Sequence, residues 1–323
     1  MSLNPARACT QSDISLYRHK IVRDLLWSLC APPIITASPT GTPWVTDYWF
    51  DELILELFEP LGELDEDPSP LLLRITEDKD RRLGRIFETL LAYAFEISHR
   101  FEVLARNVPI REQGRTLGEL DFLVRDTKLD QTLHLEVAVK FYLGFETAQK
   151  EPIWLGPDPR DRLSYKKTGM ERQLELTRSS ASHKWLEDQD INIDDSLSIM
   201  KGRLFHPLSA QHEPQQPSWI NPGHLRGWWS SVERFLEYQK TNDLLWVIVD
   251  KSDWLSPLTP NDDITPLSHD ELSIMLSQAG LFDRVFSQPV CIAGLKEGYE
   301  SVRGFLVPDS WIQENLRPNT NTH

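Results

Sequence analysis

Cysteine is scarce in this chain. Only three cysteines occur among 323 residues, and they are widely separated, at Cys9, Cys30 and Cys291. An odd number cannot all pair, and their spacing matches no pattern of metal ligands. The cysteines therefore argue against a metal site built on thiolates, and a reducing cytoplasm is the expected location.

Long apolar runs are also missing. The longest one near the N-terminus, Leu25–Cys30, is short, so neither a secretory signal nor a membrane span is predicted. The sequence contains no internal repeat and no low-complexity tract. The ordinary shares of hydrophobic (40%) and charged (26%) residues indicate a globular protein of one large or two moderate domains.

A net positive charge is absent, since the formal charge is −15. This argues against a protein that coats nucleic acid without specificity. The acids are clustered, however: residues 47–80 hold twelve Asp or Glu against two basic residues, whereas 160–172 holds five basic residues against two acids. A local basic surface stays open, although such a run is more often a solvated helix face.

The stretch 133–143 alternates strictly. Its odd positions are all apolar, and its even positions are His134, Glu136, Ala138, Lys140 and Tyr142. This period of two predicts a strand with one face in a core. The polar face carries groups that suit a metal ion and a phosphate, but a half-exposed strand with a wet polar face explains the same pattern.

Upstream, a helix and two strands are predicted. Residues 81–99 form a helix that is apolar on most sides, and Glu88 on it needs a partner, for which Arg85 three residues earlier is one candidate. Strands follow at 101–109 and 117–125, the second forming a hairpin with 133–143. In it, Leu120, Phe122 and Val124 are expected on one face and Glu119, Asp121 and Leu123 on the other.

Downstream, Asp158-Pro159 predicts the start of a helix that ends near Thr177, with Lys166 and Gln173 on its inward side. A strand is expected at 197–205. Shorter elements complete the prediction: helices at 12–30, 51–58, 221–238 and from a capping box at Ser268–Glu271 to Gly280, strands at 244–249, 289–295 and 303–307, a loop at 62–70, and irregular ends at 1–12 and 309–323.

From 81 to 205 this gives the order αβββαβ, and its polar residues resemble the PD-(D/E)XK phosphodiesterase superfamily. The resemblance implies a restriction-endonuclease-like α/β core, a mixed sheet flanked by helices, with an N-terminal helical extension (1–80) and a C-terminal α/β region (206–323). More narrowly, the chain resembles a bacterial family known as domain-of-unknown-function family 1853. The strings that carry this resemblance are GRIFE (84–88), GELDFL (118–123), HLEVAVKFYL (134–143), GPDPRDRL (156–163), KGRLF (201–205), WVIVDKSDWLSP (246–257) and RGFLVPDSW (303–311).

The superfamily resemblance implies a hydrolase in which Asp121 and Glu136 bind Mg²⁺ or Mn²⁺. Carboxylates suit these cations, which also keep waters and a substrate phosphate. Lys140 and Glu88 would be catalytic, with nucleic acid as substrate. A further set is expected in supporting or phosphate-binding positions: His134, Glu119, Lys166 and Gln173. A strand histidine beside a carboxylate is more often a hydrogen-bonded structural group.

One position departs from the superfamily pattern. The second acid is expected two residues before the lysine, where this chain has Ala138. Glu136 lies about 13 Å of strand from Lys140, against roughly 6.6 Å for the usual spacing, at about 3.3 Å per residue. Three hypotheses therefore stay open: a metal-dependent nuclease, a catalytically degenerate binding or scaffold protein with the same fold, and an unrelated α/β protein in which the motif is accidental.

Overall fold

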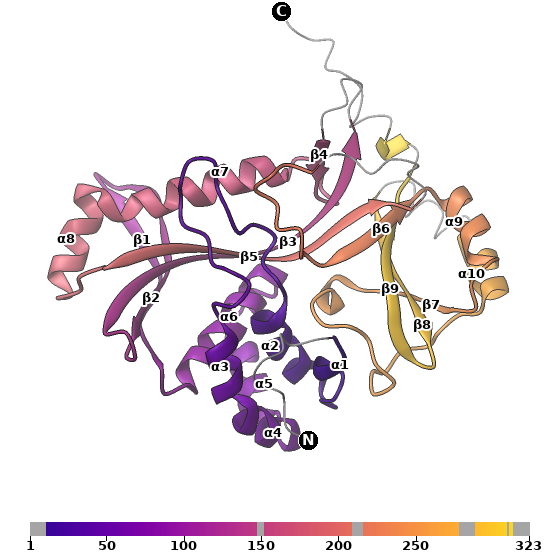
Figure 1. The fold of residues 1–323 in the computed structure, drawn as a ribbon, viewed down its shortest axis with the longest axis horizontal. Helices are drawn as coiled ribbons and strands as arrows, with labels where there is room; N and C mark the ends of the chain where they lie inside the picture. Colours follow the sequence, from indigo (N-terminus) through magenta and orange to yellow (C-terminus); the bar gives the residue numbers. More distant parts are fainter. Residues whose placement is uncertain (1–10, 147–151, 209–215, 278–287, 309, 313–323) are drawn as a thin grey trace, which may run out of the picture. The chain divides into compact units, whose positions relative to one another are not determined.

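The computed structural model describes residues 11–146, 152–208, 216–277, 288–308 and 310–312. The chain is an α/β protein in which helices flank a large mixed sheet (Figure 1). Strand order is β1-β2-β3-β5-β6-β9-β8-β7, and β4 pairs with β3. The residues group into two compact units: unit 1 holds 1–139, 165–202 and 218–224, and unit 2 holds 140–164, 203–217 and 225–323. The three segments predicted from the sequence follow other boundaries, and that division stays a prediction.

The first part of the chain alternates helices and long strands. Its elements are α1 (Gln11–Ile14), α2 (Lys20–Cys30), α3 (Asp51–Glu56), α4 (Phe58–Glu66), α5 (Ser69–Glu77), α6 (Leu83–Glu96), β1 (Phe101–Glu112), β2 (Arg115–Asp126), β3 (Gln131–Glu146), β4 (Pro152–Leu155), α7 (Leu163–Leu174), the 3-10 helix η1 (Glu175–Arg178), α8 (Ser180–Asp188) and β5 (Asp195–Pro207). The predicted order of helix, three strands, helix and strand is confirmed, with β4 and α8 as additions.

In unit 1 the sheet is covered on both sides. α2 and α6 lie against one face, and α7 and α8 lie against the other (Figure 1). α6 buries an apolar surface in which Phe95 packs on Phe101 of β1 and Phe122 of β2, with ring centroids 5.1 and 5.9 Å apart. On the opposite face, Leu186 of α8 joins Val108 and Ile110 of β1 in a separate buried cluster. The antiparallel β1–β2–β3 meander between the two helical layers confirms the predicted hairpin.

The facing of side chains along β2 differs from the prediction. Leu120 and Leu123 both join the cluster under α8, whereas Phe122 packs on Phe95 of α6. Strict alternation would place Leu120 and Phe122 on one face. The strand therefore changes face at Asp121, and the expected facing is wrong beyond that residue.

Of the two readings of the polar face of β3, the wet face is wrong for residues 134–138. His134, Glu136 and Ala138 are 0%, 4% and 8% exposed, whereas Lys140 is partly exposed. The reason is the second helical layer, which covers the face that the alternation alone leaves open. Polar groups on this face are therefore removed from water and must find partners or stay neutral.

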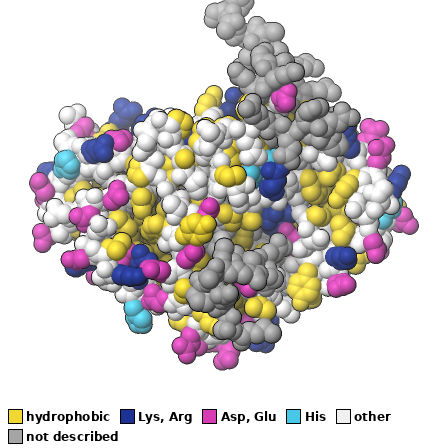
Figure 2. Space-filling view, viewed as in Figure 1, with side chains coloured by type: hydrophobic (Ala, Val, Ile, Leu, Met, Phe, Trp, Pro, Cys, Tyr) yellow, Lys and Arg dark blue, Asp and Glu magenta, His cyan; other side chains and the backbone are white. Residues whose placement is uncertain are grey.

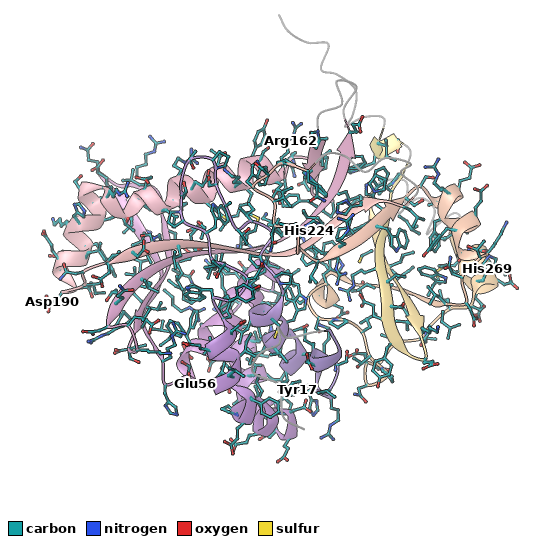
Figure 3. The ribbon with its side chains drawn as sticks, viewed as in Figure 1. Tyr17, Glu56, Arg162, Asp190, His224 and His269 are labelled. Atoms are coloured by element: carbon teal, nitrogen blue, oxygen red, sulfur yellow. The ribbon has the colours of Figure 1, made fainter. Side chains whose placement is uncertain are left out.

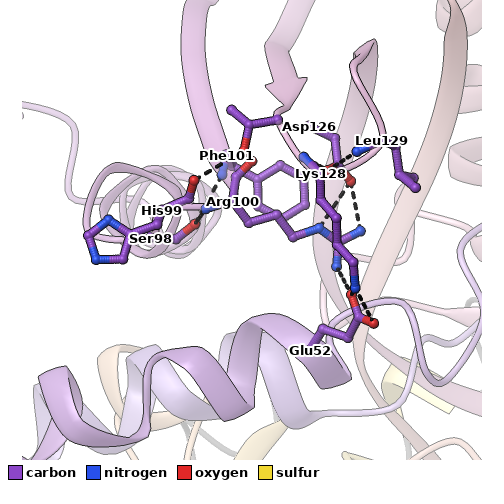
Figure 4. A network of polar contacts seen from close by, with 9 residues as sticks. Glu52, Ser98, His99, Arg100, Phe101, Asp126, Lys128 and Leu129 are labelled. Atoms are coloured by element: carbon purple, nitrogen blue, oxygen red, sulfur yellow. Dashed lines mark hydrogen bonds and ion pairs between the residues drawn. The ribbon is translucent and has the colours of Figure 1, made fainter.

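A polar network connects α3 to the start of β1 and the β2–β3 turn (Figure 4). Arg100 donates to the buried carboxylate of Asp126 at 2.7 Å and to Glu52 at 2.9 Å. Lys128 donates to the same Glu52 at 2.7 Å. Asp126 also accepts the backbone N–H groups of Lys128 and Leu129, so one buried acid fixes the turn that sets the β2–β3 register.

Unit 2 contains the C-terminal strands and a second core. Its later elements are β6 (Arg226–Ser230), α9 (Val232–Gln239), β7 (Leu245–Ile248), the 3-10 helix η2 (Lys251–Asp253), α10 (His269–Ser277), β8 (Val290–Lys296) and β9 (Tyr299–Leu306). β6 is parallel to β5 and β9, and β8 is antiparallel to β7 and β9. Trp228 stacks on Phe235 and lies edge-on to Trp246 in the core.

Several predicted helices have other bounds. The one at 12–30 is divided into α1 and α2, the one at 221–238 is β6 followed by α9, and the loop at 62–70 contains the end of α4 and the start of α5. Gly227 allows β6 to lie close to the side chains of the adjacent strand β5, because a Cβ at this position would be 2.4 Å from the Phe205 ring. Serines start two helices: Ser231 caps α9, and the capping box of Ser268 and Glu271 is confirmed.

Chain ends and turns complete the comparison. α8 ends in a turn in which Asp190, labelled in Figure 3, has a φ of 55°. The predicted stop at Gly280, the irregular segment before residue 11 and most of the C-terminal tail lie outside the described residues. No helix among the described ranges is long and apolar enough to cross a membrane.

Candidate active site

β2 and β3 separate at two facing acids. Their regular pairing ends with Phe122 opposite Leu135, so the next opposed residues along the strands are Asp121 and Glu136. The N–H of Val137 donates to Asp121 Oδ2 at 2.9 Å. The Asp121 carboxylate therefore accepts a hydrogen bond that a backbone carbonyl of β2 would accept in a regular ladder. The regular pairing of β2 with β3 does not continue beyond this point. The two acids are called the acid pair below.

Folding raises the pKa of both carboxyl groups of the acid pair. Burial and the nearby charge of Asp121 raise the pKa of Glu136 to about 9, despite the opposing charge of Lys166. Burial also raises the pKa of Asp121, against the hydrogen bond from Val137 and the charge of Lys166. Two neighbouring acids do not both ionise cheaply, and burial favours the protonated form of Glu136 in particular.

One atom of the acid pair has no partner in the described structure. Glu136 Oε2 is buried and forms no hydrogen bond with any of the described residues. An unsatisfied buried carboxyl oxygen is costly.

Glu88 lies beside the acid pair, and Arg85 holds it. Arg85 Nη1 contacts Glu88 at 2.5 Å, which confirms the expected pair three residues apart on α6. Arg85 also donates to Asn107 of β1 and, at 3.4 Å, to Glu119 of β2. Burial raises the pKa of Glu88, and so does the charge of Asp121, while Arg85 opposes both. The structure thus brings Glu88 and Glu119 near the acid pair through one arginine.

Lys166 and Gln173 project from α7 to the same region. The predicted inward stripe is confirmed, because Leu163, Met170 and Leu174 are at most 4% exposed. Gln173 Nε2 donates to the carbonyl of Glu119 at 3.4 Å, and a Cβ at Gly118 would lie 2.5 Å from Gln173 Oε1. Glycine at 118 therefore lets α7 approach β2 closely.

The start of α7 differs from the prediction. The helix begins at Leu163 and not at Asp158-Pro159. Asp158 instead accepts the N–H of Arg160, and the N–H of Gly156 bonds Asp161 O, which closes a tight loop before the helix.

Lys140 has a different partner. It belongs to unit 2, where its Nζ contacts Asp161 Oδ2 at 2.5 Å. The hydroxyl of Tyr142 donates to the other oxygen of Asp161 at 2.9 Å. The predicted catalytic role of Lys140 stays a prediction, and the charge that acts on the acid pair is that of Lys166.

His134 is fully buried and unpaired. Neither of its ring nitrogens has a hydrogen-bond partner within the described residues, so the expectation of a hydrogen-bonded strand histidine is wrong. Burial lowers the pKa of His134 to about 4. The ring is neutral at ordinary pH and is packed as an apolar group two residues before Glu136.

This burial predicts a loss of stability in acid. The unfolded chain binds a proton at His134 near pH 6.5, but the folded protein does so only near pH 4. Stability is therefore full above pH 6.5 and falls as the pH drops through this window, by up to about 3 kcal/mol. His134→Leu should remove this part of the pH dependence in urea-unfolding measurements. The same change at the exposed His99 is the control, and an equal effect at both would contradict the prediction.

Sequence reasoning missed two participants and part of the role of a third. Asn107 gave no signal, because its role depends on a left-handed backbone (φ 53°) that brings it to Arg85. Asp161 was read as part of a helix, and only the loop geometry joins it to Lys140. Arg85 was noticed as the partner of Glu88, but its reach across β1 and β2 depends on tertiary packing.

The donors suit a small divalent cation. No group of three or more His, Cys, Asp or Glu side chains within the described ranges is arranged to hold a metal ion. A two-carboxylate site fits Mg²⁺ or Mn²⁺ nevertheless, because these cations usually take one or two carboxylates and complete their shell with water and substrate phosphate. The unsatisfied oxygen of Glu136 supports the fit.

The comparisons identify a family. No curated protein and no solved structure matches the chain. The sequence from 23 to 307 matches the family described as "Domain of unknown function (DUF1853)". This span is most of the 323 residues and includes the acid pair, Glu88 and Lys166. The chain is therefore a member of the DUF1853 family.

Proposed function

We propose that this protein is a divalent-cation-dependent phosphodiesterase of the PD-(D/E)XK type that hydrolyses nucleic acid. The observation that carries the proposal is the acid pair: Asp121 and the buried Glu136 lie on neighbouring strands where their regular pairing ends, and Asp121 accepts the N–H of Val137. The element order from α6 to β5 supports the restriction-endonuclease-like fold. Asp121 and Glu136 would hold the cation.

The residues around the acid pair have distinct tasks in this proposal. The cation, when bound, polarises the phosphate and lowers the pKa of a coordinated water. Lys166 places a positive charge near the pair, where charge on a phosphate increases during hydrolysis. Arg85 keeps Glu88 close to the acids without leaving its carboxylate unpaired. Gln173 fixes α7 on β2, and thereby the position of Lys166.

The overall charge limits how such an enzyme would engage nucleic acid. The net charge is −15, and on the face seen in Figure 2 acidic and basic side chains are interspersed. A broad electrostatic footprint is therefore not available. Binding has to rely on local contacts at the site.

Proton release tests the proposal. Calorimetric titration of Mn²⁺ and Mg²⁺ should show binding that strengthens as the pH rises from 4.5 towards 9, because the cation displaces the proton of Glu136. Titrations in buffers of different ionisation enthalpy should count about one proton released per cation near neutral pH. Asp121→Asn should abolish binding. Asp161→Asn, which alters the separate pair with Lys140, is the matched control.

Two observations favour a second function. Lys140 is bonded to Asp161, and Ala138 stands where the superfamily pattern has an acid. Both fit a degenerate binding or scaffold protein that has kept the fold. If Mn²⁺ does not bind, or binds equally to Asp121→Asn, the enzyme proposal fails and this alternative replaces it.

A further inference from the structure

Unit 1 contains a cavity of about 710 Å³. Its walls are the end of α7 with η1, helix α8, the loop 40–43 and the segment 191–196 that leads into β5. Sites for small molecules typically have volumes of about 300–1,000 Å³. The acid pair, Glu88 and Lys166 do not line this cavity, so it is separate from the candidate active site.

A buried ion pair fixes the loop that forms one wall. Lys167 and Glu171 of α7 contact each other at 2.7 Å, with side chains only 10% and 12% exposed. The hydroxyl of Ser38 donates to Glu171. From Ser38 a series of hydroxyl contacts continues to Thr40 at 2.7 Å and from there to Thr42 at 2.8 Å. Both threonines line the cavity, so this wall is held in place by contacts with α7.

An unpartnered hydroxyl lies on the buried side of the cavity. Ser196 lines the cavity, and Ser198 projects to the same face of β5 because side chains alternate along a strand. Trp44, which forms a β-bridge with Ser198, donates to Glu171 of α7, which is consistent with this face. Ser198 is 0% exposed, and its hydroxyl has no hydrogen-bond partner among the described residues. An unsatisfied buried hydroxyl is costly, so the cavity offers a polar contact that the fold itself does not use.

The interior of the cavity is partly apolar. Leu174 at the end of α7 and Leu186 of α8 line it and are 4% and 6% exposed. Ile191 and Ile193 line it from the opposite segment and pack against the same cluster as Leu186. An aliphatic chain placed here would lose its contact with water on several sides.

The rim of the cavity has an excess of carboxylates. Glu175, which lines it, is paired with Arg178 at 2.6 Å. The other three acids of the lining, Glu187, Asp194 and Asp195, form no ion pair with any described residue. Asp194 and Asp195 accept only backbone N–H groups. Acids from α8 and from the segment before β5 therefore present uncompensated negative charge around an apolar interior.

We propose that this cavity binds an aliphatic amine that carries more than one ammonium group. The methylene chain packs on Leu174, Leu186 and Ile193, and the ammonium groups pair with carboxylates of the two walls. The hydroxyls of Thr40 and Thr42 accept further N–H groups. The inference is independent of the proposed function, because it uses none of the residues placed at the acid pair.

Calorimetric titration tests the proposal. Full-length protein in EDTA is titrated with 1,4-diaminobutane, with spermidine and with the neutral 1,4-butanediol. Both amines should bind with one-to-one stoichiometry, and the diol should not. The double change Glu187→Gln with Asp195→Asn should weaken amine binding about 10- to 100-fold, since it removes two charge-assisted contacts. Asp188→Asn is the matched control, because it removes the same charge from the next residue of α8, outside the cavity, and should change affinity less than about twofold.

A second variant tests the cavity apart from its charge. Thr42→Phe places a ring in the space next to Leu174 without altering any acid, so it should abolish binding of both amines. Thr42 is partly exposed on a loop, and thermal melts establish that the variant is folded. If the variant does not fold, the double change at Glu187 and Asp195 decides the question alone.

Four results would overturn the proposal. Equal weakening by Asp188→Asn and by the double change would indicate general electrostatics. Equal binding of the diol would reject the charge, and binding of Mg²⁺ but of no amine would reject the ligand class. Binding of a lysine-rich peptide while both amines fail would indicate a protein partner instead. Asp121→Asn should leave amine binding unchanged, so this proposal and the proposed function can fail separately.

Discussion

Glu136→Gln is expected to make the protein more stable while abolishing its affinity for Mn²⁺. Folding raises the pKa of Glu136 from 4.5 to about 9, so the folded state opposes ionisation of this carboxyl. Below pH 4.5 the group is protonated in both states and has no effect. As the pH rises through this window, the unfolded state ionises first and stability is lost. A glutamine does not ionise, yet it can still donate to Asp121.

The expected gain near neutral pH is on the order of 2 kcal/mol, or several degrees in melting temperature. It should vanish at pH 4.5 and grow towards pH 9. Thermal melts of both proteins across this range, without metal, measure it. Glu119→Gln is the control, because its carboxylate is partly exposed and paired with Arg85. A Glu136→Gln variant that is less stable at every pH would show that the acid pair has a structural role.

Addition of Mn²⁺ should reverse the order of stability. In the proposed function the cation binds the folded wild-type protein and not the unfolded chain, so it should raise the melting temperature of that protein by mass action. The variant would lack one of the two proposed ligands and should not respond. Functional sites typically contain groups that destabilise the ligand-free protein and become favourable when the ligand binds.

The sequence predicted the elements of the site better than their orientation. Three local patterns predicted elements of the site correctly. The alternation in 133–143 corresponds to β3, the apolar helix at 81–99 to α6, and the stripe with Lys166 and Gln173 to α7. The opposition of Asp121 and Glu136 follows from the hairpin, which was also predicted. These features depend only on chain spacing and on which face is apolar.

The errors arose where tertiary packing overrides local pattern. β3 looked half-exposed because nothing in its own residues shows that α7 and α8 cover the second face. β2 changes face at Asp121 because a side chain takes part in the strand ladder there, and alternation cannot show this.

Lys166→Met is expected to lower the rate of nucleic-acid cleavage about 10²- to 10⁴-fold, the usual range for a positioned charge or general acid–base group. Lys166 is the lysine whose charge acts on both acids. Its removal should also raise the pKa of the acid pair further and weaken Mn²⁺ binding at neutral pH. Methionine keeps the apolar stem, so folding should be nearly unaffected.

Lys140→Met is the matched comparison, because the superfamily pattern predicts the catalytic lysine on β3. In the structure Lys140 neutralises Asp161, so its loss should lower the melting temperature and leave a larger share of activity than Lys166→Met. Cleavage assays with Mn²⁺ on single-stranded, duplex and structured nucleic acids, run beside thermal melts, separate the two lysines. If Lys140→Met abolishes turnover with folding intact and Lys166→Met does not, the role assigned here to Lys166 belongs to Lys140. The enzyme proposal is rejected if neither the wild type nor either variant cleaves any substrate and Lys140→Met has a much lower melting temperature. In that case Lys140 stabilises the fold through its ion pair with Asp161.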